Sequence, residues 1–256
     1  MMCYNLIDGI HQMNRMDMNP IDLGSDLLNY IIESGLNPGE RLPAISTLKS
    51  PEHLGISTSK VREQLEVARA LGLVEVRSKT GTRLQEYTFT PAVRLSLLYA
   101  LARSPQLFEQ FSQLRVRVEE AFWQEACACL IDEDKQTLRD CVQEAREKLT
   151  GDWIRIPNQE HRTFHVTIFK RLGNPFVLGL VEAYWDAYHA VQLDTYSDYD
   201  YLRTVWDYHE RTLDAICAGD YIAAQTAFVE HTKLIRQLPQ MQGIQGDETA
   251  DSDTDR

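Results

Sequence analysis

Four of the seven histidines in this 256-residue chain fall on apolar faces of expected helices. His161 and His165 are four residues apart, so both imidazoles project from one side of a single helix. His209 lies ten residues before the turn at Gly219-Asp220, and His231 lies eleven residues after it. At a rise of about 1.5 Å per residue, these two rings stand at nearly the same height in an antiparallel helix pair. The four imidazoles could therefore bind one divalent metal ion.

A single histidine on an apolar face is more often a hydrogen-bonded core residue than a metal ligand. Burying four imidazoles without a cation, however, leaves donors and acceptors without partners, and each of them costs free energy. The spacing alone therefore leaves two interpretations open. One is a metal site, and the other is a set of polar core residues around an organic ligand.

The histidines belong to a long region, from Ala92 to Leu238, in which apolar residues recur at helical spacing. Proline, glycine and aspartate mark the breaks between successive helices. We expect an all-helical bundle that occupies residues 92–240. Its expected helices span residues 92–103, 105–130, 133–149, 157–172, 174–196, 199–218 and 220–238.

A second stretch has the pattern of a DNA-binding motif. Ser57 can cap a helix, which Gly72 then ends, and residues 73–77 alternate like a strand. Residues 78–81 have the composition of a turn, and residues 82–84 return as a second strand. A helix before Ser57 would complete a winged helix-turn-helix.

That preceding helix should lie between Ala44 and Leu54. Pro51 would break a helix interior, although proline is tolerated in a first turn. We therefore expect this helix to be shortened, or to restart at Ser50-Pro51.

The charge distribution is compatible with DNA binding although the formal net charge is −12. Residues 57–83 contain six cations and three anions, and much of the acidity lies near the C-terminus. A modest basic patch on an acidic chain predicts strongly salt-dependent binding. The residues expected to contact DNA are Ser57, Thr58, Ser59, Lys60 and Arg62 in the second helix and Lys79, Thr80, Gly81 and Arg83 in the wing.

Residues 38–86 resemble the DNA-binding domain of the GntR superfamily of bacterial transcription regulators. The segment Pro38–Pro43 resembles the first loop of that domain, and Ile56–Leu65 resembles its recognition helix. Ala70–Val74 resembles the family's exit into the wing. The helical region resembles the sensor of the FadR-like branch, an all-helical domain of the FCD type.

This second resemblance implies a metal site in the helical domain. His165 follows Phe164 and precedes an asparagine–proline turn, as in the family's signature, and His209 and His231 match its two later histidines. His161 stands where the family usually has aspartate. An all-imidazole set favours zinc or nickel over manganese or magnesium. Alternatively, His161 is not a ligand, or Glu160 compensates for the missing aspartate.

Arg115 lies on the apolar stripe of the first long helix of this domain. The resemblance implies that it holds the carboxylate of a small effector, which suits the bidentate geometry of a guanidinium. The alternative is an ion pair with Glu119 or Glu120 on the surface.

The expected fold class is mainly α, with an N-terminal winged helix-turn-helix and a C-terminal helical bundle sensor. The DNA-binding domain should span residues 20–86, and a linker at 87–91 should join it to the bundle. Residues 1–19 read as a flexible tail, and residues 241–256 as a disordered acidic tail.

The function expected from these features is a DNA-binding transcriptional regulator that senses a small molecule through its metal. A homodimer should bind a palindromic operator in double-stranded DNA. No apolar run could cross a bilayer and no secretory signal is evident, so we expect a cytoplasmic protein without a membrane partner.

Two other functions compete with this one. A metal-dependent enzyme is disfavoured, because the chain has no HExxH motif, nucleophile elbow or phosphate-binding loop. The other alternative is a protein-interaction module that retains a degenerate DNA-binding domain. Thr58 stands where relatives usually place an arginine, and Ser46 falls near another usually basic position.

Overall fold

The computed structural model describes residues 21–151, 155–190 and 199–234. The chain divides into two compact units, with the boundary between Leu95 and Ser96. Both tails, predicted at residues 1–19 and 241–256, lie outside the described residues.

The N-terminal unit is a small helical domain with one hairpin. Its two strands pair antiparallel, with Val74 opposite Leu84 and Arg77 opposite Gly81. The order of elements is that of the predicted winged helix-turn-helix. They are α1 (Asp26–Ser34), α2 (Ile45–Leu48), α3 (Thr58–Ala70), β1 (Val74–Arg77) and β2 (Gly81–Leu84).

Helix α3 begins where the sequence predicts it, because the Ser57 side chain accepts a hydrogen bond from the Lys60 N–H at 3.2 Å. One face of α3 contributes Val61 and Leu65 to a buried cluster that also contains residues of α1 and α2, Leu42 and Val74. Gly72 follows the helix at φ +74°, and a methyl group there would lie 2.5 Å from the Pro91 ring. Only glycine suits that turn.

Helix α2 is shortened, as predicted, to the four residues Ile45–Leu48. It does not restart at Ser50-Pro51. The chain instead closes two turns, in which Leu54 N–H donates to Leu48 O at 3.0 Å and Gly55 N–H to Ser50 O at 2.9 Å. These bonds satisfy the backbone without a second helix.

The next helix, α4 (Thr90–Arg103), begins inside the segment 87–91 that was expected to be a linker. Pro91 is its second residue, where the missing N–H has no intrahelical partner to lose.

The described residues of the C-terminal unit form helices joined by short connections, without strands, and these helices match the predicted segments. Among these residues, no helix is both long and apolar enough to cross a bilayer. The helices that follow α4 are α5 (Leu107–Ala128), α6 (Asp132–Thr150), α7 (Asn158–Phe169), α8 (Pro175–Ala190), α9 (Tyr199–Ala218) and α10 (Tyr221–Leu234). Helix α6 packs against α7 and α9, while α5 packs against α8 and α10.

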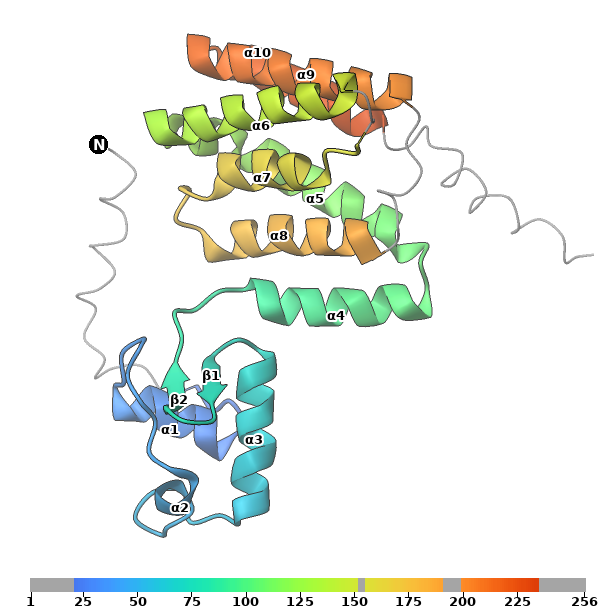
Figure 1. The fold of residues 1–256 in the computed structure, drawn as a ribbon. Helices are drawn as coiled ribbons and strands as arrows, with labels where there is room; N and C mark the ends of the chain where they lie inside the picture. The colour runs from blue at the N-terminus through green and yellow to red at the C-terminus, as the bar shows by residue number, and fades with distance from the viewer. Residues whose placement is uncertain (1–20, 152–154, 191–198, 235–256) are drawn as a thin grey trace, which may run out of the picture. The chain divides into compact units, whose positions relative to one another are not determined.

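Helices α9 and α10 form the predicted antiparallel hairpin (Figure 1), with Gly219 at φ +78° in the turn between them. Aromatic side chains fill much of the surrounding core. Trp123, Phe164, Tyr184, Trp185 and Trp206 are all buried. The hairpin and α7 bring the predicted histidines together.

Candidate functional site

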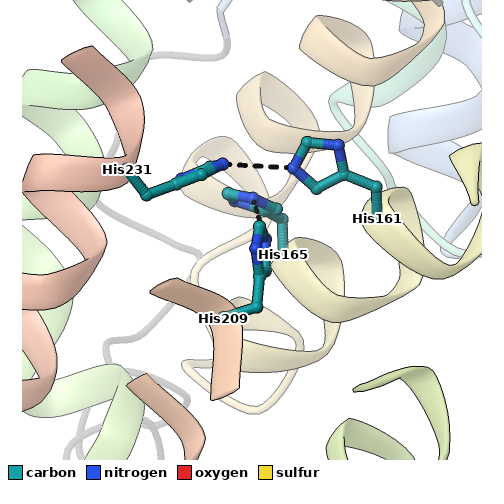
Figure 2. A group of neighbouring side chains, drawn as sticks. All are labelled: His161, His165, His209 and His231. Carbon is teal, nitrogen blue, oxygen red and sulfur yellow. Dashed lines mark hydrogen bonds between the residues drawn. The ribbon is translucent and has the colours of Figure 1, made fainter. Parts of the chain in front are cut away.

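The four predicted histidines converge on one point inside the helical unit (Figure 2). His161 and His165 come from α7, His209 from α9 and His231 from α10. One ring nitrogen from each residue lies within 4.8 Å of the other three. Two pairs are closer: His161 Nε2 is 3.3 Å from His231 Nε2, and His165 Nε2 is 3.2 Å from His209 Nε2.

The two shorter separations match those of a tetrahedral metal site. Zinc–nitrogen bonds of about 2.0–2.1 Å place tetrahedral ligand atoms about 3.3 Å apart. All four side chains are buried, and their Nε2 atoms face inward. The donor set therefore fits a divalent ion that accepts imidazole ligands, such as zinc or nickel.

Burial also keeps the imidazoles in the neutral form that a metal requires. Desolvation lowers the pKa of His209 to about 4, although its bond to the Val205 carbonyl opposes that shift. Burial, followed by the neighbouring imidazoles, lowers the pKa values of His161, His165 and His231 well below the usual range. At neutral pH the rings therefore carry no charge.

The histidines differ in the hydrogen bonding of their Nδ1 atoms. His209 Nδ1 donates to the Val205 carbonyl at 2.7 Å, so its Nε2 keeps a free lone pair. His165 Nδ1 lies 3.9 Å from Glu119 Oε1 and has no hydrogen-bond partner among the described residues. His231 Nδ1 likewise lacks one there.

Arg115 is 1% exposed and Glu119 is 0% exposed, so the ion pair between them is buried. Arg115 Nη1 lies 3.1 Å from Glu119 Oε2, and the guanidinium carbon lies 4.0 Å from the Tyr184 ring centroid. Burial raises the pKa of Glu119 to about 7, and Arg115 opposes the shift. The alternative prediction was an ion pair of Arg115 with Glu119 or Glu120 on the surface. The pairing with Glu119 is correct, but the surface location is wrong, because the stripe on which Arg115 lies faces the core.

Two donors of Arg115, Nε and Nη2, have no hydrogen-bond partner in the described part of the chain. Buried guanidinium donors without acceptors are costly. An anionic ligand would satisfy them.

Glu160 does not take the place of the missing aspartate. Its carboxylate pairs with Lys148 of α6. Among the described residues, the candidate metal-binding group consists of the four histidines and includes no carboxylate side chain.

A small cavity of about 10 Å³ adjoins His161. Tyr201 and Trp206 line it, and the buried Tyr201 hydroxyl has no hydrogen-bond partner among the described residues. The space is about that of one water molecule.

The predicted DNA-contacting residues occupy two places in the N-terminal unit. Ser57 caps α3, and Thr58, Ser59, Lys60 and Arg62 lie in its first turns. Lys60 is paired with Asp26 at 3.3 Å, whereas the exposed Arg62 has no ion pair among the described residues.

In the wing, Lys79 and Thr80 are exposed at the tip of the hairpin. Arg83 donates to the Gly39 carbonyl at 2.7 Å. Gly81 has φ +81°, and a methyl group built on it would lie 2.5 Å from Arg41 Nε. Arg41, which sequence reasoning did not single out, therefore adds a further cation beside the wing.

Comparison with known proteins gives consistent matches. The model of the FCD domain matches residues 110–234. The chain is 24% identical over 208 residues to the transcriptional regulator LutR of Bacillus subtilis, covering 78% of this chain and 92% of the relative. It is 25% identical over 226 residues to the Uxu operon transcriptional regulator of Escherichia coli, covering 84% of each chain.

Among solved structures, Streptococcus agalactiae GntR matches with a TM-score of 0.57 at 22% identity. The match covers 82% of this chain and 95% of that one. This similarity establishes the fold.

Proposed function

Because the chain belongs to the GntR family of transcriptional regulators and carries an FCD ligand-sensing domain, we propose that it senses a small carboxylate through a histidine-bound divalent metal. The relatives and the fold are those of regulators, not enzymes. The observation that carries the metal proposal is the convergence of four buried Nε2 atoms on one point.

His165, His209 and His231 would hold the ion, with His161 as the fourth ligand. Bound there, zinc or nickel would supply positive charge and a coordination position for an anionic oxygen. The chain's own contribution is to keep the four rings neutral, buried and correctly oriented.

Arg115 would bind the effector carboxylate. Its Nε and Nη2 donors form one edge of the guanidinium, and neither has a partner among the described residues. A carboxylate can accept both hydrogen bonds at once. This support is independent of the metal.

The N-terminal unit would bind DNA. Arg62 would contact base edges, and Lys79 and Arg83 would contact phosphates. One winged helix per chain suits a homodimer on a palindromic operator. We also propose that the protein belongs to the FadR-like branch and acts in the cytoplasm, where bacterial DNA lies. We propose residues 20–86 as the DNA-binding domain and 92–240 as the sensor.

An effector can alter DNA affinity only if it binds more tightly to one of two arrangements of the protein. The test is therefore a gel shift with DNA that flanks the protein's own gene, on metal-loaded and chelator-treated protein, with a panel of small mono- and dicarboxylates. The proposal predicts specific binding that a carboxylate changes only in the metal-loaded form.

Two results would oppose it. Metal content below about a tenth of an equivalent, with no uptake of added zinc or nickel, would exclude the metal site. An absence of specific DNA binding at low salt would favour the alternative, a protein-interaction module.

A further inference from the structure

Glu119 lies between the two parts of the proposed sensor. Its Oε1 accepts a hydrogen bond from Arg115 Nη1 at 3.3 Å and lies 3.9 Å from His165 Nδ1. Its Oε2 lies 3.1 Å from Arg115 Nη1 but has no hydrogen-bond partner among the described residues. The carboxyl group is 0% exposed. A buried carboxyl group without several strong partners is destabilising, so its position calls for a reason beyond stability.

His165 needs an acceptor at this position. Its Nε2 faces the cluster, 3.2 Å from His209 Nε2, so its Nδ1 carries the proton when Nε2 binds a metal. Among the described residues Nδ1 has no hydrogen-bond partner, and Glu119 Oε1, at 3.9 Å, lies about 0.7 Å beyond the usual upper limit of about 3.2 Å for an N–H···O hydrogen bond. His209 already has its acceptor, the Val205 carbonyl.

We propose that Glu119 is a positioning residue for the metal centre, which accepts the Nδ1 proton of His165 and holds that ring in the ligating orientation. This inference rests on the proposed metal site. Metal-binding histidines commonly donate to a carboxylate, which fixes the tautomer and makes the ligand more basic.

The same carboxylate connects the metal site to the effector site. Arg115 uses Nη1 for Glu119, so its Nε–Nη2 edge stays available to a second carboxylate. An effector carboxylate at that edge would bind the same guanidinium group that pairs with Glu119. The Glu119 carboxylate would in turn interact with the Nδ1 proton of His165. Effector and metal should therefore affect each other's affinity by the same factor.

The test measures zinc affinity by competition with a chromophoric chelator, in the absence of any effector. Glu119→Gln keeps the size of the side chain and removes its charge. The double variant Arg115→Met/Glu119→Met removes a net-neutral pair, so the field at the metal changes little while the contact to His165 is lost. Replacing both members of a buried ion pair is commonly tolerated by the fold.

Glu120→Gln is the matched control, since it makes the same change on the next residue, whose carboxylate pairs with Arg117 at the surface. Both Glu119 variants should bind zinc about 10–100-fold more weakly than the parent, with the control unchanged. The visible absorption of the cobalt-loaded forms should shift in the same two variants. Melting of the metal-free proteins checks that each variant is folded.

Zinc affinity in the folded double variant within about twofold of the parent, with an unchanged cobalt spectrum, would overturn the role of Glu119 and leave the metal site intact. If the parent itself takes up no zinc, the proposed function fails, and the role of Glu119 fails with it.

Discussion

The Nδ1 atom of His209 lies 2.7 Å from the carbonyl oxygen of Val205, one turn earlier in α9. Because a carbonyl can only accept, this bond places the ring proton on Nδ1 and leaves Nε2 as a lone-pair donor. Helix α9 therefore holds the His209 ring with its Nε2 lone pair toward the other three histidines.

His209→Ala should abolish stoichiometric metal binding while the metal-free domain stays folded. Bound metal stabilises the native state by about 2.7 kcal/mol when its free concentration is 100 times the dissociation constant. The parent should therefore melt at a higher temperature with zinc or nickel than without, and the variant should not. Metal analysis and thermal melts measure both effects.

The exposed His53 of the N-terminal unit provides a control for that experiment, because its replacement should leave uptake unchanged. Retention of a full equivalent of metal by the His209 variant would remove this residue from the ligand set.

His161→Asp should shift metal preference toward harder ions. A carboxylate ligand favours manganese and magnesium more than imidazole does. Competition between manganese and zinc, followed by metal analysis, should show a larger manganese fraction in the variant than in the parent. Identical preferences in the two proteins would mean that position 161 does not touch the ion.

The metal-free protein should lose stability as the pH falls from about 6.5 toward 4. Burial lowers the pKa of His209 to about 4, so between these values the unfolded state binds a proton that the native state does not. Stability then rises with pH, by about 1.4 kcal/mol per unit for each such histidine. Denaturant titrations at pH 7, 6 and 5 measure the slope.

His209→Gln should reduce that slope by the share of one histidine, because glutamine does not titrate, while His161, His165 and His231 keep their lowered pKa values. An equally steep slope in this variant would assign the effect to other groups.

Arg62→Ala should weaken binding to the specific operator by about 1–3 kcal/mol if Arg62 contacts a base edge. Arg69 is the matched control, since it lies in the last turn of the same helix and is paired with Glu66. Gel shifts with specific and unrelated DNA distinguish the two. Equal affinity of the Arg62 variant and the parent for the operator would contradict the placement of the recognition helix.

Lys79→Ala should weaken binding to all DNA sequences alike and reduce the salt slope by about one. The reason is that Lys79 lies exposed at the wing tip, where a phosphate contact is expected. Titrations at several salt concentrations measure the slope. A loss confined to the specific operator would assign Lys79 to base recognition instead.

The histidine cluster could be predicted because its geometry follows from helix periodicity and one turn. The spacing of His161 and His165 fixes a shared face, and Gly219 fixes the hairpin that pairs His209 with His231. The fold class followed from similarly local signals, such as the Ser57 cap and the glycine at position 72.

The position of Glu119 could not be predicted in this way. Its spacing from Arg115 indicates an ion pair, but such pairs are usually exposed, and only the packing of α5 shows that this one is buried. The turns after α2 could not be predicted from local rules either, because the backbone bonds that replace a restarted helix join residues five and six positions apart, Gly55 to Ser50 and Leu54 to Leu48.

The group of four clustered side chains includes no carboxylate. If these side chains bind an ion, that composition sets the charge that an effector must balance. Neutral imidazoles leave a divalent ion with its full charge, and the buried pair of Arg115 and Glu119 adds none. In a low-dielectric interior an unbalanced double charge is strongly unfavourable. An aspartate at position 161 would leave one positive charge for the effector to neutralise, whereas His161 leaves two. The chain should therefore select dianions, such as dicarboxylates, over monocarboxylates of the same size.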